Sequence, residues 1–265
     1  MREADKVSAR IIEVINDESF HFAPCTLQGL HGMIFEDVLQ FAGAYREVNI
    51  RKHEWILNED SVTYGPWRSI EANLESAFAR EEEYDYAGKS PGEMVAHLAR
   101  FIARIWQIHP FREGNTRTTA VFAIKYLRSL NIPVTNELFA ANSWFFRNAL
   151  VRANYENPLK NIPRDYEPLE RFFRCLILGE KHELKSRYLR VSLSQVERQE
   201  LADGRQTTDE GCQKRLSEKG CQKTEDKLVE LLKNHPHLTQ VGMASALFIS
   251  RQAVQKHLEK LKASG

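Results

Sequence analysis

The sequence has little cysteine, no long apolar run and almost no net charge, and each absence excludes a class of protein. Its four cysteines, Cys25, Cys175, Cys212 and Cys221, form no Cys-x-x-Cys pair, so neither a zinc site nor a disulfide scaffold is expected. Reduced thiols are typical of a cytoplasmic protein. No run of 18 apolar residues occurs, and the charged N-terminus lacks the apolar core of a signal peptide, so no membrane span is expected. A net charge of +1 commits the chain neither to nucleic acid nor to a membrane surface.

Length and composition predict a soluble globular protein. The chain has 265 residues, of which 42% are hydrophobic and 28% are charged, enough for one large or two smaller domains. Residues 1–190 contain most of the apolar periodicity and are expected to form one domain. Residues 198–223 are rich in Gln, Glu, Lys, Asp and Gly, so residues 191–223 are predicted to be a linker.

The C-terminal segment, residues 224–265, regains helical periodicity and is predicted to form a helix-turn-helix, winged-helix-like module. Four polar side chains of its third helix would then face outward, where they could contact DNA: Arg251, Gln252, Gln255 and Lys256. The segment has six Lys or Arg against four Asp or Glu, a weak excess of positive charge for DNA binding. A helical module for dimerisation, giving a homo-oligomer, is the alternative.

Residues 109–118, His-Pro-Phe-Arg-Glu-Gly-Asn-Thr-Arg-Thr, carry the densest chemistry in the chain. They lie between two segments of helical spacing, and the first begins with a capping box of Ser90 and Glu93 around Pro91. Apolar spacing predicts other helices over residues 1–18, 26–43, 69–79, 136–156 and 169–178, with a solvated acidic loop over 81–85. Residues 109–118 are therefore predicted to be the loop of a helix–loop–helix.

This loop combines the groups that a nucleotide phosphate site requires. Gly114 and Asn115 permit a turn that presents backbone N–H groups, and the helix that follows favours an anion at its N-terminus. Arg117 in the first turn can form paired hydrogen bonds to phosphate oxygens, and Glu113 is a hard oxygen ligand for Mg²⁺. His109 can act as a general base. The alternative is a polar connecting loop in which His109 merely caps the preceding helix.

The stretch resembles the signature of the Fic family, His-x-Phe-x-(Asp/Glu)-Gly-Asn-Gly-Arg-x-x-Arg. The matching positions are His109, Phe111, Glu113, Gly114, Asn115 and Arg117. Thr116 and Ala120 replace the second Gly and the final Arg of the signature. The resemblance extends over about residues 20–188 and includes a Gly-x-Tyr-Arg-like turn at residues 43–46. It implies a mostly α fold, a Fic-type helical bundle with a β-hairpin flap, here followed by the C-terminal helix-turn-helix module.

Residues 47–64, called the flap segment below, are predicted to form that hairpin. Val48, Ile50 and the apolar residues 55–57 flank a polar stretch, and Gly65 closes the section. In Fic proteins the flap covers the motif loop and holds the target peptide as an added strand. An ordinary irregular connection is the alternative.

The resemblance implies transfer of AMP from ATP to a Ser, Thr or Tyr hydroxyl of a protein, with Mg²⁺ as cofactor. His109 would be the base, Glu113 the metal ligand, and Asn154 a nucleoside contact. The phosphates would bind to Gly114, Asn115, Thr116 and Arg117. The alternatives are a DNA-binding regulator with a weakly active Fic domain, or Fic-type transfer of another group, including phosphorylation and the reverse de-AMPylation.

The two departures from the signature carry their own expectations. Thr116 requires a backbone without positive φ, or strain of about 1 kcal/mol. Ala120 removes a cation that in the family meets the γ-phosphate and pairs with an inhibitory Glu. The nearest copy of the inhibitory motif ends at Glu210, but Gln206 stands where Ser or Thr is expected. Control by a Glu–Arg pair is therefore not expected here.

Overall fold

The computed structural model describes residues 3–191, Gln255 and Leu258. The chain divides into two compact units, Met1–Leu201 and Ala202–Gly265, and the fold below is that of the first. The predicted linker and the helix-turn-helix module lie, apart from Val191, Gln255 and Leu258, outside the described residues, so both stay predictions.

The described part of the first unit is helical, as the apolar spacing predicts. Its α-helices are α1 (Glu3–Asn16), α2 (Pro24–Phe35), α3 (Ile70–Glu82), α4 (Pro91–Ile108), α5 (Asn115–Ser129), α6 (Glu137–Ala141), α7 (Ser143–Asn154) and α8 (Glu167–Phe173). Short 3-10 turns are η1 (Trp55–Leu57), η2 (Trp67–Ser69), η3 (Pro158–Lys160) and η5 (Ser186–Leu189), and η4 (Arg174–Leu178) is a π-helical turn. No strand occurs among residues 3–191, and two isolated β-bridges take its place.

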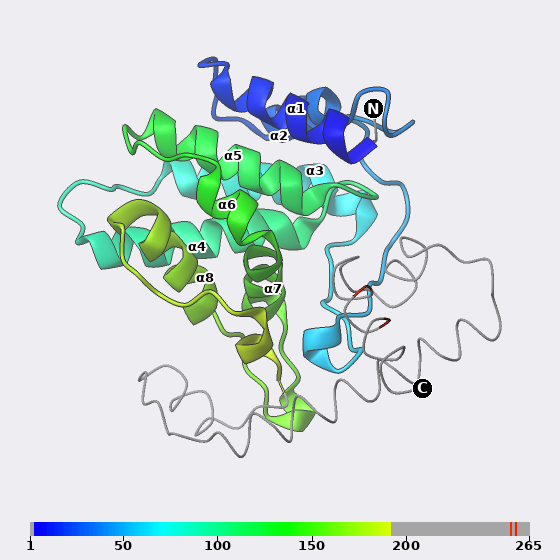
Figure 1. Ribbon diagram of the computed structural model, residues 1–265, viewed down its shortest axis with the longest axis vertical. Coiled ribbons are helices and arrows are strands. Elements are labelled where there is room, and N and C mark those ends of the chain that lie inside the picture. Colours follow the sequence, from blue (N-terminus) through cyan, green and yellow to red (C-terminus); the bar gives the residue numbers. More distant parts are fainter. Residues whose placement is uncertain (1–2, 192–254, 256–257, 259–265) are drawn as a thin grey trace. The chain divides into compact units, whose positions relative to one another are not determined.

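Helix α4 lies at the centre of the bundle. The predicted capping box starts it: Glu93 N–H donates to Ser90 Oγ at 3.3 Å and Ser90 N–H donates to the Glu93 carboxylate at 2.8 Å. Its apolar face is buried against α3, α5, α7 and α8. In Figure 1 α1 and α2 lie on one side of α5 and α4 on the other, with α7 and α8 beyond α4.

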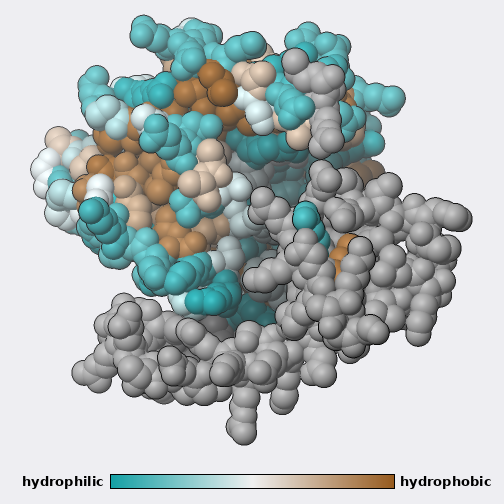
Figure 2. Space-filling model, in the orientation of Figure 1, coloured by the Kyte–Doolittle hydropathy of each residue, from teal (hydrophilic) through white to brown (hydrophobic). Residues whose placement is uncertain are grey.

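Aromatic side chains fill the space between α3, α4 and α5. Phe22 lies 4.7 Å from Phe78 and 4.8 Å from Tyr126, measured between ring centroids. Figure 2 shows further apolar residues gathered at the surface on one side of the bundle. A small apolar cavity of about 180 Å³ opens among Tyr86, Pro91, Met94, Leu98, Leu127, Leu130, Ile132, Ile177 and Leu178. No described helix combines the length and apolar composition needed to cross a bilayer.

Three helix predictions need correction in extent. Helix α2 ends at Phe35 rather than near Gly43, because Glu36 turns to ψ 139° and Asp37 takes a φ of 54°. The predicted helix over 136–156 is broken at Asn142 into α6 and α7. The predicted helix over 169–178 begins earlier, as α8, and its last turn widens into η4.

The predicted acidic loop at 81–85 is wrong at Glu81. This carboxylate lies in α3 and is 4% exposed. It accepts hydrogen bonds from Tyr86 Oη at 2.5 Å, from Tyr126 Oη at 2.6 Å and pairs with His97 Nε2 at 2.7 Å. Three polar partners explain how a carboxylate can be buried between α3, α4 and α5.

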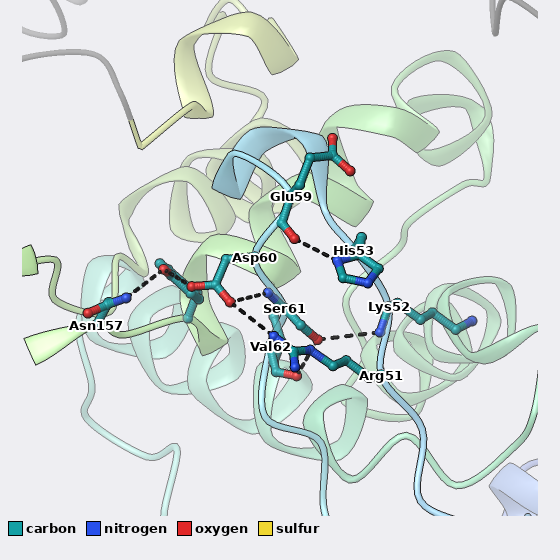
Figure 3. A network of polar contacts seen from close by, with 9 residues as sticks. Arg51, Lys52, His53, Glu59, Asp60, Ser61, Val62 and Asn157 are labelled. Atoms are coloured by element: carbon teal, nitrogen blue, oxygen red, sulfur yellow. Dashed lines mark hydrogen bonds and ion pairs between the residues drawn. The ribbon is translucent and has the colours of Figure 1, made fainter. Parts of the chain in front are cut away.

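The β-hairpin predicted for the flap segment is not formed by strands. Glu54 and Asp60 make an isolated antiparallel bridge, with Glu54 N–H donating to Asp60 O at 2.9 Å, around the turn η1. Beyond this bridge, side chains replace the ladder: Lys52 N–H donates to Ser61 Oγ at 3.3 Å, and His53 Nδ1 meets Glu59 O at 2.7 Å. Figure 3 shows the two extended limbs joined by these contacts.

Candidate active site

The loop between α4 and α5 places His109 at the end of α4 in a left-handed conformation, with φ 52°. The imidazole is 3% exposed. Its Nδ1 lies 3.2 Å from Trp106 O. Because a carbonyl only accepts, Nδ1 carries the proton and Nε2 keeps its lone pair. Nε2 is buried and has no hydrogen-bond partner among the described residues.

The surroundings of His109 keep its imidazole neutral. Burial lowers the pKa of His109 to about 3, and the positive charge of Lys52 adds to this effect. The phenol of Tyr64 packs beside the imidazole, with ring centroids 4.1 Å apart. A neutral imidazole with a free Nε2 is the form that accepts a proton.

Asn115 fixes the shape of the loop with its side chain. Its Oδ1 accepts from Phe111 N–H at 3.0 Å and its Nδ2 donates to Phe111 O at 2.7 Å. The residue is 4% exposed. Both polar atoms of the Asn115 amide thus bond within the loop, while its backbone N–H, at the first position of α5, has no partner within the helix.

Both the backbone conformation and the close packing at position 114 require a glycine. It has a φ of 80°, in the left-handed region that glycine tolerates. A Cβ at this position would lie 2.4 Å from Phe35 Cε2 and 3.2 Å from His31 Nε2. The loop thus passes directly over the end of α2.

His31, a side chain of α2, holds one end of the loop. His31 is fully buried and stacks on Phe111 at 3.8 Å between ring centroids. Gly43 N–H donates to its Nδ1 at 2.8 Å, so its Nε2 carries the proton and donates to Glu113 O at 3.1 Å. Burial lowers the pKa of His31 to about 4, so its imidazole is neutral at neutral pH.

Arg46 holds the other end of the loop. Its Nε donates to His109 O at 2.7 Å and its Nη2 to Ile108 O at 3.2 Å and to Gly65 O. The side chain is 1% exposed. A cation on the last carbonyls of α4 also opposes the negative end of the helix dipole. Arg46 therefore fixes the backbone that carries His109.

Thr116 and Arg117 occupy the first turn of α5, as predicted. Thr116 has no positive φ, so the strain considered for this replacement is absent. Its Oγ1 instead accepts from Trp106 Nε1 at 3.0 Å. The Arg117 guanidinium lies over the Phe35 ring, 4.6 Å from its centroid. The first N–H groups of α5 and this guanidinium face the same cavity.

Glu113 presents a carboxylate at the mouth of the cavity. Its side chain is 61% exposed, and Lys52 Nζ lies 3.5 Å from its Oε1. No group of three His, Cys, Asp or Glu that could hold a metal occurs in the described part of the chain. One carboxylate fits Mg²⁺ that arrives with a nucleotide, because Mg²⁺ keeps several waters and combines one or two carboxylates with phosphate oxygens. Glu113 is the residue that would hold it.

The opposite wall of the cavity comes from the start of α7. Arg147 forms two hydrogen bonds to Glu54, at 2.7 and 3.0 Å. Glu54 belongs to the flap segment and is 1% exposed. Trp144 is 65% exposed and lines the cavity. Helix α7 thus contributes to the site through its first turns.

The cavity has a volume of about 360 Å³. It is lined by Lys52, Tyr64, Trp106, His109, Glu113, Gly114, Asn115, Thr116, Arg117, Ser143, Trp144 and Arg147. Among these, Lys52, Arg117 and Arg147 are cationic and Glu113 is the one carboxylate. Two of these cations are paired, Arg147 with Glu54 and Lys52 with Glu113, and the remaining positive charge suits an anion.

Asn154 was predicted to contact a nucleoside, and the structure places it in the core, away from this cavity. It ends α7, and its Nδ2 donates at 3.0 Å to both Ala103 O and Leu150 O. The residue is 4% exposed and does not line the cavity. At a rise of about 1.5 Å per residue, it lies roughly 16 Å along the helix from Ser143. Its amide serves the core.

Sequence reasoning thus found the loop residues but missed most of their supports. His31, Lys52, Tyr64 and Arg147 had no distinguishing local pattern. Arg46 was noticed only as part of the family-like turn at residues 43–46, without a role.

Comparison with known proteins finds similarity to one family. The model of the Fic/DOC family matches residues 22–127. A curated relative, the probable protein adenylyltransferase y4lH of Sinorhizobium fredii (strain NBRC 101917 / NGR234), is 32% identical over 114 residues. The match covers 43% of this chain and 56% of that protein, little more than half of the relative's length.

Solved structures share the fold. The N-terminal Fic domain of an effector protein from Bartonella sp. AR 15-3 has a TM-score of 0.51 at 15% identity, covering 65% of this chain and 80% of that one. The BepC protein of Bartonella tribocorum, solved with bound AMPPNP, has a TM-score of 0.50 at 15% identity, covering 65% and 85%. At such identities the likeness concerns the fold alone.

Proposed function

We propose that the protein, whose residues 22–127 match the model of the Fic/DOC family, transfers AMP from ATP to a Ser, Thr or Tyr hydroxyl of a protein. One observation carries the proposal. The imidazole of His109 is buried and neutral, and its Nε2 has no partner among the described residues beside a cavity lined by three cations.

The phosphate side of the cavity supports a nucleotide as substrate. The N–H groups of Asn115, Thr116 and Arg117 begin α5 and have no partner within the helix. Together with the helix dipole and the Arg117 guanidinium they favour phosphate oxygens. The adenylyltransferase name of the S. fredii relative and the AMPPNP in BepC are consistent with a nucleotide here.

His109 would act on the other substrate. Its Nε2 would take the proton of the target hydroxyl as the hydroxyl oxygen bonds to the α-phosphorus. The bond from the α-phosphorus to the oxygen bridging to the β-phosphate breaks, and pyrophosphate leaves. A base placed in this way contributes about 10²- to 10⁴-fold. Mg²⁺ bound with the nucleotide, and held by Glu113, would offset negative charge on the phosphates.

The supports around the loop set the base before any ligand binds. Arg46 holds His109 O, His31 holds Glu113 O, and Asn115 holds both backbone groups of Phe111. A nucleophile–base–phosphate arrangement needs its members within about 0.5 Å of the productive geometry. The flap segment would align the target hydroxyl, although its edge carries one β-bridge rather than a strand.

The test uses ATP labelled separately at the α- and the γ-phosphate, with the purified protein and a cell lysate. AMP transfer predicts protein-bound label from the α-position only. Label from the γ-position only would mean phosphorylation and would overturn the proposal, and mass spectrometry of the adduct would separate these outcomes. The variant His109→Ala should lose transfer, whereas the matched control His182→Ala, a histidine paired with Glu180 at the surface, should keep it.

Release of AMP from an adenylylated protein would instead support the reverse reaction. DNA binding by residues 224–265 and a homo-oligomer remain predictions of the sequence. Labelled DNA and a sedimentation experiment on the full chain test them independently of transfer.

A further inference from the structure

Lys52 is a charged residue in the cavity that the mechanism above does not use. Its side chain is 29% exposed and its Nζ lies 3.5 Å from Glu113 Oε1. It lines the cavity together with His109 and with the first residues of α5. Among the charges around His109, Lys52 has the largest effect on the imidazole. The ammonium therefore lies near both the base and the carboxylate.

The flap segment directs this side chain to the cavity. The backbone N–H of Lys52 is held by Ser61 Oγ, and Ser61 N–H donates to Asp60 Oδ1 at 2.8 Å. Asp60 is in turn anchored to the residue that follows α7, because its Oδ2 accepts from Tyr155 Oη at 2.8 Å. Figure 3 shows the Lys52 side chain leaving this network, while the neighbouring Arg51 turns back toward Asp60.

The pair of Lys52 and Glu113 is suited to exchange. Both side chains are partly exposed, and their separation of 3.5 Å is long for a charge-assisted hydrogen bond. Such pairs contribute little to stability. A phosphate that enters the cavity can thus replace Glu113 as the partner of the ammonium at little cost, which leaves the carboxylate free for a cation.

The place of the transferred phosphate follows from the two flanking groups. A hydroxyl that gives its proton to His109 Nε2 attacks a phosphorus close to the imidazole. The oxygens of the same phosphate meet the N–H groups at the start of α5. Lys52 lines the same cavity and reaches it from the flap segment.

We propose that Lys52 is a further catalytic residue, whose ammonium contacts the nonbridging oxygens of the phosphate that is transferred. The inference rests on the proposed function. As the hydroxyl oxygen bonds to the α-phosphorus and the bond to the pyrophosphate oxygen breaks, charge shifts over the phosphate oxygens, and a fixed cation stabilises it. Lys52 stays protonated throughout, and the hydroxyl proton goes to His109.

The variant Lys52→Met removes the charge but keeps most of the length of the side chain. We expect the initial rate of α-label transfer at saturating ATP to fall about 10²-fold, with a smaller change in the KM for ATP. Lys52→Arg should recover part of the rate. The matched control is Lys185→Met, which breaks another surface Lys–Glu pair, at 2.7 Å from Glu183, and should leave the rate within about twofold.

A second measurement separates direct contact from an effect through Glu113. Binding of AMPPNP is measured by calorimetry in the variant Glu113→Gln, with a chelator present. If Lys52 contacts phosphate, adding Lys52→Met weakens this binding by about tenfold, since one charge-assisted contact is lost. If Lys52 acts only by holding Glu113, the second substitution changes nothing, and the proposal fails.

The outcomes distinguish the two proposals. Transfer by the unaltered protein together with a full rate in Lys52→Met overturns the role of Lys52 and leaves the proposed function standing. No transfer of α-label by the unaltered protein overturns the proposed function and, with it, a catalytic Lys52. A low rate in Lys52→Met together with weaker metal-free binding supports both.

Discussion

Trp106 donates its indole N–H to Thr116 Oγ1 at 3.0 Å, and this bond joins the last turn of α4 to the first turn of α5. Trp106 is 1% exposed, so its N–H has little access to water as an alternative. Thr116 stands where the Fic signature has glycine, and a glycine could not accept this bond. The replacement is thus matched by a partner on the other side of the loop.

Replacing Thr116 with Val should therefore destabilise the protein. The Val side chain keeps the shape but leaves the buried indole N–H without an acceptor, which costs about 1–3 kcal/mol in the free energy of unfolding. Thr116→Ser keeps the hydroxyl and should cost less. Urea unfolding of both variants checks this, and equal losses would show that the bond contributes nothing.

Gly114→Ala should be far more damaging than a backbone penalty alone predicts. The added Cβ would meet Phe35 Cε2 at 2.4 Å, and φ is 80°. Gly88→Ala is the matched control, because Gly88 has a φ of 72° and no atom within 4 Å of the added Cβ. Each variant carries the left-handed cost of about 1–2 kcal/mol, so the difference in unfolding free energy between them measures the clash.

Gly114→Ala should also weaken nucleotide binding, because it displaces the loop that lines the cavity. If the contact with Phe35 is the cause, adding Phe35→Leu should recover part of that affinity. The double variant still carries the cost of a cavity in the core. Calorimetry with AMPPNP reads the recovery. Equal unfolding free energies for Gly114→Ala and Gly88→Ala would contradict the clash, because they would mean that the Phe35 side chain moves away from the added Cβ at no cost.

Arg46→Lys should lose both stability and transfer. A lysine carries one compact group, whereas the Arg46 guanidinium donates to the carbonyls of Val48, Gly65, Ile108 and His109. Buried carbonyls left without donors cost about 1–3 kcal/mol each. Arg68→Lys, at an exposed position over Trp67, is the control and should unfold like the unaltered protein. A transfer rate unchanged in Arg46→Lys would show that the anchor of His109 O is dispensable.

Stability should fall in mild acid because of His31. Burial lowers the pKa of His31 in the folded state to about 4, below the ordinary value of 6.5. Between these values the unfolded chain binds the proton and the folded one does not, so the free energy of unfolding decreases as pH falls from 6.5 to 4. The slope is at most about 1.4 kcal/mol per pH unit for one histidine. Unfolding of His31→Gln across this range should show a shallower slope, and an unchanged slope would contradict the assignment.

Catalysis should tolerate acid better than an ordinary histidine base would. Burial, with the charge of Lys52, lowers the pKa of His109 to about 3, so the imidazole is already neutral at pH 5.5. A base with a pKa of 6.5 would lose about tenfold in kcat/KM between pH 7.5 and 5.5. For transfer by this protein we expect a loss of less than about twofold. A tenfold loss, with the fold intact by circular dichroism, would place the pKa of the base near 6.5.

Sequence reasoning located the elements whose causes are local. The start of α4 could be predicted from Ser90, Pro91 and Glu93, because a capping box involves only four consecutive residues. The phosphate site could be predicted from residues 109–118, because all the groups that it needs lie within ten positions of the chain. Both predictions depend on residues that are neighbours in the chain. The structure forms the capping box, and it brings residues of the loop together around one cavity.

The errors concern relations between distant segments. Alternating residues in the flap segment fit a hairpin, but side chains such as Ser61 took over the bonds that a strand ladder would make. Asn154 lies on the expected helix, yet its distance from the cavity depends on where α7 begins. His31 and Arg46 reach carbonyls 82 and 63 positions away, and no local pattern specifies which carbonyl faces them.

His31 and Arg46 lie close together in the chain and hold the two ends of the loop 109–118 by hydrogen bonds to Glu113 O and His109 O. The loop sequence 109–118 is consequently not a portable unit. Grafted between two helices of another scaffold, it would keep its side chains but lose the grip on Glu113 O and His109 O. A designer who wishes to move this chemistry would have to carry residues 31–46 along with it, as the second half of one cassette.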